Sequence, residues 1–292
     1  MPSNDYFIAS DHKGMCVMIR FTEKLSTRNY FLVDKLSSII GAFRQGIKQK
    51  RCHFCDDSTF NDEAICTPCY CDLPWNTDCC SRCALPMNIR TTDISNINTQ
   101  DSSNNKPFKL VCGECISNPA PFTLAIACFR YEVPIGKAIQ LLKYSHKRYF
   151  AIFFARLLTK RIQQEYIDTP IPSLLLPVPM HKKKLKERGF NQAFLISQQL
   201  SKSLSIPTNT QILQKVRSTI AQTGLDKRQR MQNLKGAFTI TKPISGLHIA
   251  LIDDVMTTRA TADLLCKLLL DAGAQQVDVW CIARTAKYRH KK

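Results

Sequence analysis

The segment IALIDDVMTTRAT at residues 249–261 constrains the fold more than any other part of the chain. An apolar run of strand length leads directly into two acidic residues and then into a threonine-rich stretch. A continuous apolar strand is typical of a parallel sheet that is covered on both faces. Ligands of open parallel sheets bind beyond the carboxyl ends of the strands. The segment therefore predicts a ligand-binding turn at the edge of a parallel sheet.

The chain from about residue 119 onward alternates between short apolar runs and longer amphipathic segments. The expected strands are 122–131, 173–179, 248–254 and 277–283, and the expected helices are 134–145, 149–166, 191–204 and 261–274. Strands and helices in alternation, joined by short connections, indicate βαβ units and a parallel sheet. We therefore expect an α/β domain over residues 119–292.

The acidic pair and the residues after it suit different parts of a ribose phosphate. Asp253 and Asp254 offer carboxylates that can accept from ribose hydroxyls or bind a magnesium ion. The stretch 257–261 supplies hydroxyls and backbone N–H groups at the start of a helix, where phosphate binds well. A strand that is merely capped into a helix would explain one threonine. It would not explain two aspartates followed by three threonines.

Four CxxC pairs occur between residues 52 and 115. They are Cys52/Cys55, Cys66/Cys69, Cys80/Cys83 and Cys112/Cys115. A CxxC turn directs two thiolates at one metal ion, and two such pairs complete a tetrahedral zinc site that is structural. Buried free thiols or a redox CxxC would explain one pair but not four. We expect two zinc sites, most simply from the first two and the last two pairs. An interleaved pairing, or replacement of a ligand by Cys71 or Cys79, is the alternative.

Composition divides the chain into three regions. Residues 1–50 form an N-terminal extension with one amphipathic helix expected within 30–47. Residues 51–118 form the cysteine-rich zinc-binding region, and within it 88–106 is a polar segment that reads as a loop. The α/β domain follows at 119–292.

The net charge points to an anionic partner. The chain has 41 Lys and Arg against 23 Asp and Glu, a formal charge of +18. Such an excess suggests nucleic acid or a phosphorylated substrate, although a generally basic surface is the alternative. No apolar run is long enough to span a membrane, and the N-terminus lacks the pattern of a signal peptide. We therefore expect a cytoplasmic protein, in which 14 cysteines do not form a disulfide framework.

The segment DDVMTTRAT resembles the PRPP-binding signature of type I phosphoribosyltransferases, and the wider chain resembles the ComF family, particularly its GntX-like members. Further segments that carry the resemblance are LPW at 73–75, CGEC at 112–115, LKY at 142–144, PVPMHKKKLKERGFNQA at 177–193, QRMQNLKGAF at 229–238 and VWCIART at 279–285. The resemblance implies an α/β fold: a type I phosphoribosyltransferase-like parallel sheet flanked by helices, preceded by a small double zinc-knuckle region.

The resemblance also implies roles for individual residues. The expected PRPP-binding residues are Asp253, Asp254, Thr257, Thr258, Arg259, Ala260 and Thr261, with Mg²⁺ accompanying PRPP. The expected catalytic residues are Asp253 and Asp254, which position the ribose, and Arg188, which stabilises the departing pyrophosphate. The expected contacts to pyrophosphate or nucleic acid are Lys182, Lys183, Lys184, Lys186 and Arg188. A solvated charged loop is the alternative for this basic segment.

One residue departs from the family pattern. Arg259 stands in the middle of the phosphate-binding loop, where the pattern has glycine. Glycine tolerates unusual φ values and allows a close approach of the backbone to a ligand. Arginine could strain the loop, fill the space of the phosphate, or reach the phosphate itself. We expect altered PRPP binding with the loop shape largely kept.

Two functions follow from the resemblance. The first is a phosphoribosyltransferase that uses PRPP and magnesium, for which no motif marks the acceptor. The second is a non-catalytic protein that handles single-stranded DNA and uses the fold as a ligand-binding module. The ComF resemblance implies a role in DNA uptake and natural competence, with the competence machinery as a partner.

Overall fold

The computed structural model describes residues 7–10, 16–19, 50–59, 64–87, 110–217 and 236–286. The chain divides into two compact units, Met1–Asp72 and Leu73–Lys292. The first two CxxC pairs therefore belong to the smaller unit and the last two to the larger one. The helix predicted within 30–47 and the polar loop predicted at 88–106 lie outside the described residues.

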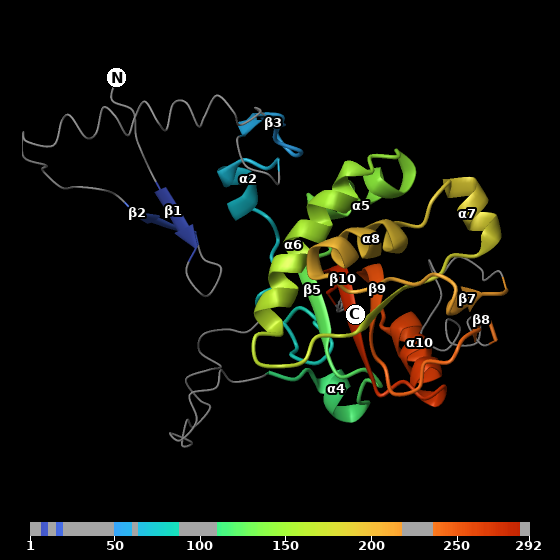
Figure 1. Cartoon of the computed structure of the whole chain (residues 1–292). Helices are drawn as coiled ribbons and strands as arrows, with labels where there is room; N and C mark the ends of the chain where they lie inside the picture. Colours follow the sequence, from blue (N-terminus) through green and yellow to red (C-terminus); the bar gives the residue numbers. More distant parts are fainter. Residues whose placement is uncertain are drawn as a thin grey trace, which may run out of the picture. The chain divides into compact units, whose positions relative to one another are not determined.

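The smaller unit contains short elements (Figure 1). Strands β1 (Phe7–Ser10) and β2 (Cys16–Ile19) form one antiparallel pair, and β3 (Lys50–Arg51) and β4 (Ser58–Thr59) form another. Helix α2 (Thr67–Cys71) begins with a proline in its first turn. Proline suits that place because its missing N–H would have no helical acceptor there.

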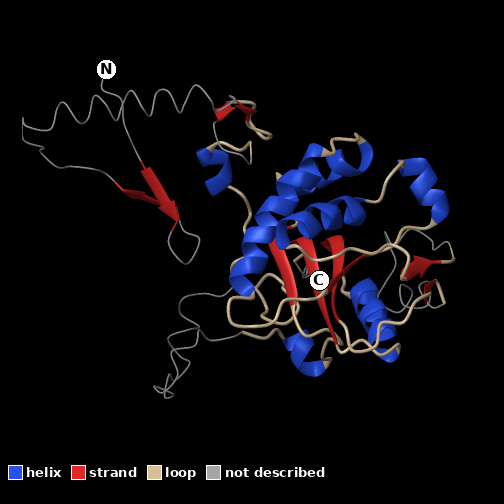
Figure 2. Ribbon diagram, in the orientation of Figure 1, coloured by secondary structure: helices blue, strands red, loops and turns tan. Residues whose placement is uncertain are grey.

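The larger unit is built on a four-stranded parallel sheet (Figure 2). The strand order is β5 (Ala125–Arg130), β10 (Gln276–Arg284), β9 (His248–Met256) and β6 (Leu174–Pro177). All three neighbouring pairs are parallel. This is the flanked parallel sheet that the alternating pattern predicted.

The remaining elements of the larger unit surround this sheet. They are α4 (Gly113–Ser117), α5 (Ile135–Tyr144), α6 (Tyr149–Glu165), α7 (Lys182–Arg188), α8 (Gln192–Leu204), α10 (Ala260–Asp271) and the hairpin of β7 (Leu213–Lys215) and β8 (Phe238–Ile240). Helices α6 and α8 pack against each other and against one side of the sheet, whereas α10 lies on the other side (Figure 1). The four predicted helices are all present, and α7 is an additional helix in the basic segment.

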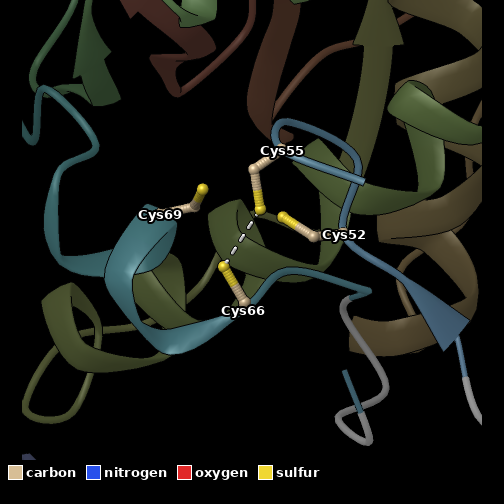
Figure 3. A group of neighbouring side chains, drawn as sticks. All are labelled: Cys52, Cys55, Cys66 and Cys69. Carbon is tan, nitrogen blue, oxygen red and sulfur yellow. Dashed lines mark hydrogen bonds between the residues drawn. The ribbon is translucent and has the colours of Figure 1, made fainter. Parts of the chain in front are cut away.

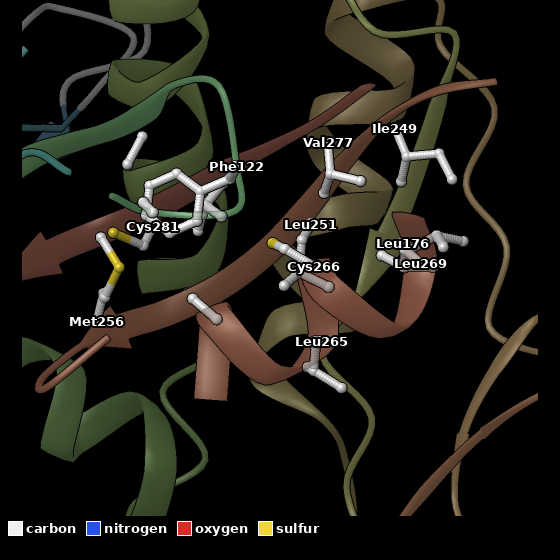
Figure 4. Close-up of a cluster of buried hydrophobic side chains, with 14 of the residues drawn as sticks. Phe122, Leu176, Ile249, Leu251, Met256, Leu265, Cys266, Leu269, Val277 and Cys281 are labelled. Atoms are coloured by element: carbon white, nitrogen blue, oxygen red, sulfur yellow. The ribbon is translucent and has the colours of Figure 1, made fainter. Parts of the chain in front are cut away.

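Alternate residues of each strand face opposite sides of the sheet and pack against the helices on each side. Ile249 and Leu251 of β9 belong to the same buried cluster as Leu265 and Leu269 of α10. Figure 4 shows this cluster, which also contains Phe122, Leu176, Met256, Cys266, Val277 and Cys281. Because side chains alternate across a strand, Ala250 and Ile252, which are also fully buried, face the α6–α8 side. Burial on both faces explains why the strands read as continuous apolar runs.

The strand direction places the predicted ligand site. Strands β6 and β9 run parallel, with Pro177 opposite Ile252, so their carboxyl ends meet at one edge of the sheet. The acidic pair lies at the end of β9, directly beyond this register. Among the described residues, no helix has the length and apolar character needed to cross a membrane.

Candidate functional site

The acidic pair lies within the last residues of strand β9 rather than in the loop after it. Strand β9 continues to Met256, so Asp253 and Asp254 are held in extended backbone and point to opposite sides of the sheet edge. The backbone N–H of Asp254 donates to Oδ1 of Asp253 at 2.8 Å. Burial, together with repulsion from Asp254, raises the pKa of Asp253 well above that of an ordinary carboxyl. A carboxyl in this state can donate a hydrogen bond to a ribose hydroxyl or ionise when a cation binds.

Asp254 is paired with a lysine that the sequence analysis did not assign. Lys143, near the end of α5, forms an ion pair with Oδ2 of Asp254. Burial acts to lower the pKa of Lys143, but attraction by Asp254 outweighs it and the pKa lies above the ordinary value. Lys143 falls in the LKY segment of the family resemblance, which was the available signal. Its pairing with Asp254 needs the tertiary structure.

Arg188, at the end of α7, contacts the helix that carries Lys143. Its guanidinium carbon is 5.0 Å from the centre of the Tyr144 ring, and Tyr144 is the neighbour of Lys143. Nη1 of Arg188 donates to Oε1 of Gln192 at 3.0 Å, which fixes the side chain at the end of α7. The structure therefore brings Arg188 to α5, the helix whose Lys143 pairs with Asp254, and its contact with pyrophosphate stays a prediction.

The turn after β9 presents its two threonines to solvent. Thr257 and Thr258 are exposed, Ala260 is buried at the first position of α10, and Thr261 is half-buried. We call residues 257–261 the phosphate turn. It leads into α10, a 12-residue helix, and a helix N-terminus carries the N–H donors and partial positive charge that favour an anion.

Arg259 does not extend into the space above the phosphate turn. Its backbone is left-handed, with φ of 67°, and its side chain is 2% exposed. Nε donates to Oδ2 of Asp263 at 2.9 Å, and Nη2 donates to the carbonyl of Asn118 at 2.9 Å. A left-handed conformation costs a residue with a side chain about 1 to 2 kcal/mol. Residue 259 thus adopts a left-handed conformation that glycine would adopt without strain, and the buried contacts of the guanidinium offset the strain.

Basic side chains of α7 face solvent beside the hairpin. Lys182, Lys183, Lys184 and Lys186 are all exposed, and Arg188 is half-buried. Burial and the nearby charges of Lys184 and Arg217 lower the pKa of Lys215, on β7, to about 8. Positive charges that repel one another in this way are stabilised when a polyanion binds.

The two cysteine tetrads are built alike. We call the tetrad of Cys52, Cys55, Cys66 and Cys69 the first knuckle (Figure 3), and the tetrad of Cys80, Cys83, Cys112 and Cys115 the second knuckle. In each knuckle the leading cysteine accepts at its carbonyl from the residue four positions later, Asp56 or Ala84, which has positive φ. The third cysteine of each is the N-cap of a short helix, α2 or α4. The structure thus shows the sequential grouping of pairs.

The sulfur positions fit a tetrahedral metal site. Zinc–sulfur bonds of about 2.3 Å place the sulfurs of a tetrahedron about 3.8 Å apart. The Sγ atoms of Cys55 and Cys66 are 3.5 Å apart, and those of Cys83 and Cys112 are 3.7 Å apart. Within each knuckle, all four sulfurs lie within 4.8 Å of one another. Cys71 and Cys79 lie outside both groups.

The thiol pKa values favour a bound cation. A hydrogen bond from Cys83 lowers the pKa of Cys80 to about 4, and the same bond raises the pKa of Cys83. Burial acts to raise the pKa of Cys52, but backbone donors near Cys55 and Cys66 lower it to about 7. One thiol in each knuckle ionises readily, and the thiolate is the form that binds a metal ion. Both knuckles could hold zinc.

Curated relatives match the chain over most of their length. The DNA utilization protein YhgH from Salmonella typhi is 35% identical over 178 residues, which cover 60% of this chain and 78% of that protein. Competence protein F from Haemophilus influenzae is 34% identical over 178 residues, which cover 59% of this chain and 78% of that protein. No protein-family model matches the chain.

Solved structures similar to the chain include a hypoxanthine phosphoribosyltransferase from Staphylococcus aureus. It is 12% identical, with a TM-score of 0.30, and the match covers 50% of this chain and 72% of that protein. A score this low does not by itself establish a relationship. Identity of 35% over more than three quarters of a curated relative does, and the chain therefore belongs to the ComF family of DNA utilization and competence proteins.

Proposed function

We propose that the larger unit binds PRPP with magnesium at the carboxyl end of β9, and that the protein acts in the cytoplasm in the use of external DNA. The observation that carries the proposal is the conjunction at one sheet edge of the acidic pair, the Lys143 ion pair and the exposed threonines of the phosphate turn. The names of the relatives, a DNA utilization protein and a competence protein, support the process.

Each group has a role suited to its position. Asp253 and Asp254 orient the ribose through its hydroxyls, and a magnesium ion, when bound, would neutralise the pyrophosphate. Thr257 and Thr258 bind the 5′-phosphate at the start of α10. Lys143 holds the side chain of Asp254 in place beside the ribose.

Phosphoribosyl transfer would use the same arrangement. Arg188 is held by Tyr144 and Gln192 on the basic side of the site, where it stabilises the charge that develops on departing pyrophosphate. Such stabilisation acts mainly in the transition state, so replacing Arg188 should lower turnover more than substrate affinity. The acceptor remains to be identified by experiment.

The direct test is calorimetric titration of magnesium–PRPP into the zinc-loaded protein. We expect saturable binding that weakens about 10- to 100-fold in the variant Asp253→Asn/Asp254→Asn, because charged hydrogen bonds contribute about 1.5 to 3 kcal/mol. Asp271→Asn, an exposed carboxylate at the far end of α10, is the matched control and should bind as the wild type does. Equal affinity of the acidic-pair variant and the control would reject the site.

We also propose that both knuckles hold structural zinc. Four thiolates leave no open position on the metal, so the ions would not take part in the chemistry. Metal analysis of the purified chain should give two zinc ions per molecule. One ion or none would contradict the assignment of two sites.

A second candidate function, binding of single-stranded DNA, is favoured by the charge around α7. Burial lowers the pKa of Lys215, and the nearby charges of Lys184 on α7 and of Arg217 lower it further. A surface that carries such charges can contact a phosphate backbone without reading its sequence.

The salt dependence of DNA affinity tests this candidate. Each contact to a single strand contributes about 0.7 to the slope of log affinity against log salt. Lys184→Ala/Lys186→Ala should therefore reduce the slope by about 1.4. Lys202→Ala, an exposed lysine on α8, is the control and should leave it unchanged. A slope that the α7 variant does not alter would place the DNA elsewhere.

A further inference from the structure

A buried arginine joins the phosphate turn to the second knuckle. Nη1 of Arg259 donates to Sγ of Cys115 at 3.3 Å, and Nη2 donates to the carbonyl of Asn118 just beyond α4. Nε donates to Asp263 in the first turn of α10. The guanidinium therefore contacts three groups: Cys115, which is a candidate metal ligand, the residue that follows α4, and the helix α10 that follows the phosphate turn.

A second buried arginine joins the same two regions from another side. Nε of Arg284, on β10, donates to the carbonyl of Cys83 at 3.3 Å. Its Nη1 donates to the carbonyl of Met256 at 2.9 Å and also to the carbonyl of Thr257. Thr285 donates to the Thr257 carbonyl at 3.2 Å. The backbone on the strand side of the phosphate turn is thus tied to the other CxxC pair of the second knuckle.

The charge of the second knuckle explains why a cation is buried here. A zinc ion with four thiolates carries a formal charge of about −2. Arg259 is 2% exposed and Arg284 is 3% exposed, and each directs its guanidinium toward the knuckle or its backbone. A buried guanidinium is stabilised where a charged acceptor accompanies it, and a thiolate bound to metal is such an acceptor.

We propose that Arg259 is a positioning residue that couples metal binding at the second knuckle to the conformation of the phosphate turn. With metal bound, the Cys115 thiolate holds the guanidinium, and the guanidinium holds the backbone of residue 259 in its left-handed conformation. Without metal, Cys115 loses its fixed place and the turn loses this support. The identity of the ligand at the turn rests on the proposed function, whereas the coupling between knuckle and turn does not depend on which ligand binds.

The coupling is reciprocal by thermodynamic necessity. If metal at the second knuckle raises the affinity of the turn for an anion, then the anion raises the affinity for metal by the same factor. Arg259 thereby gives the structural zinc a role beyond folding.

Arg259→Gly tests the contribution of the side chain separately from that of the backbone conformation. Glycine adopts positive φ without strain, so this variant keeps the turn geometry accessible while it removes the links to Cys115, Asn118 and Asp263. Arg259→Lys keeps the charge but lacks the fork that reaches several acceptors. Asp263→Asn weakens the ion pair on the helix side alone, and Asp271→Asn is its control on the same helix.

The first readout is zinc release to a coloured chelator, measured in a background of Cys52→Ser/Cys66→Ser so that only the second knuckle reports. We expect Arg259→Gly to weaken zinc binding about tenfold or more, as loss of a partner to a metal ligand commonly does. Arg259→Lys should restore part of the affinity. Asp271→Asn should release zinc as the wild type does.

The second readout is hydrogen exchange of the amides in residues 257–261, with and without zinc. In the wild type, zinc removal should increase exchange in the phosphate turn. In Arg259→Gly the amides of the turn should exchange faster than those of the wild type even with zinc bound, and zinc removal should change their exchange little. PRPP affinity, where it is measurable, should follow the same pattern.

The outcomes separate the coupling from the proposed function. If zinc-loaded wild type fails to bind PRPP, the proposed function fails, but zinc release and exchange still decide the coupling. If Arg259→Gly holds zinc as tightly as the wild type does and the turn ignores zinc removal, the coupling is overturned. A purely structural arginine would lower the melting temperature without changing zinc release.

Discussion

At the scale of single residues, Asp253 is held in a state that disfavours its charge. Its pKa is raised by burial and by Asp254, so the folded protein keeps a proton that the unfolded chain releases. The free energy of unfolding should therefore fall as pH rises from the ordinary carboxyl pKa, about 3.9, toward the raised value. Asp253→Asn removes this loss and can still accept from the Asp254 N–H at Oδ1.

We therefore expect Asp253→Asn to stabilise the protein at neutral pH by about 0.5 to 2 kcal/mol, an increment typical of relieving a functional strain. Urea unfolding at a series of pH values measures this, and the advantage should disappear near pH 4. Asp254→Asn is the contrasting variant, because it leaves Lys143 without its ion pair and should destabilise. A pH-independent effect of Asp253→Asn would show that another cause is at work.

The residue scale also shows what the sequence could not predict. The acidic pair and the threonines were recognisable because they follow one another along the chain. Cys115 and Asn118, two partners of Arg259, are separated from it by 144 and 141 positions, and no local pattern encodes such contacts. Lys143 was visible within a motif, but its role depends on the packing of α5 beside β9.

At the scale of elements, α7 depends on the residue that ends it. Gly189 is the C-cap of α7 with φ of 78°, and its N–H donates to the carbonyl of Leu185. A Cβ at this position would meet only His146, at 3.8 Å, so the conformation rather than space requires glycine. The direction in which α7 presents Arg188 follows from this cap.

Gly189→Ala should therefore destabilise the protein by about 1 kcal/mol, the cost of a left-handed conformation without glycine, and weaken pyrophosphate binding. Gly136→Ala is the matched control, because Gly136 lies in α5 at ordinary φ and an added Cβ would meet the Tyr131 ring at an ordinary contact distance of 3.7 Å. That substitution should be neutral or slightly stabilising. Thermal unfolding and pyrophosphate titration of both variants give the comparison, and equal effects would refute the role of the cap.

The elements of the sheet were predictable and α7 was not, for a physical reason. Strands buried on both faces and helices with one apolar face leave periodic signals in the sequence. Helix α7 has no buried residue, so hydrophobic periodicity could not reveal it. Its signals were instead a run of good helix formers and a glycine just past the end, with His181 as N-cap accepting from the Lys183 N–H.

At the scale of the whole molecule, the two knuckles have the same local construction but different surroundings. The cysteines of the second knuckle are between 1% and 7% exposed and belong to the buried cluster that contains Leu251 and Leu265. In the first knuckle Cys55 is exposed and Cys69 half-buried, and the knuckle belongs to the unit that ends at Asp72. A zinc ion in the second knuckle should therefore stabilise the fold of its unit more than a zinc ion in the first knuckle does.

Cys115→Ser should destabilise the larger unit by about 4 kcal/mol or more, since loss of a structural metal is among the most damaging single changes. Cys55→Ser should change the smaller unit and leave the main thermal transition close to that of the wild type. Scanning calorimetry with zinc analysis of each variant measures both effects. With a chelator, zinc should leave the exposed first knuckle before the buried second one. A single cooperative loss of both ions and of the main transition would show instead that the two units unfold together.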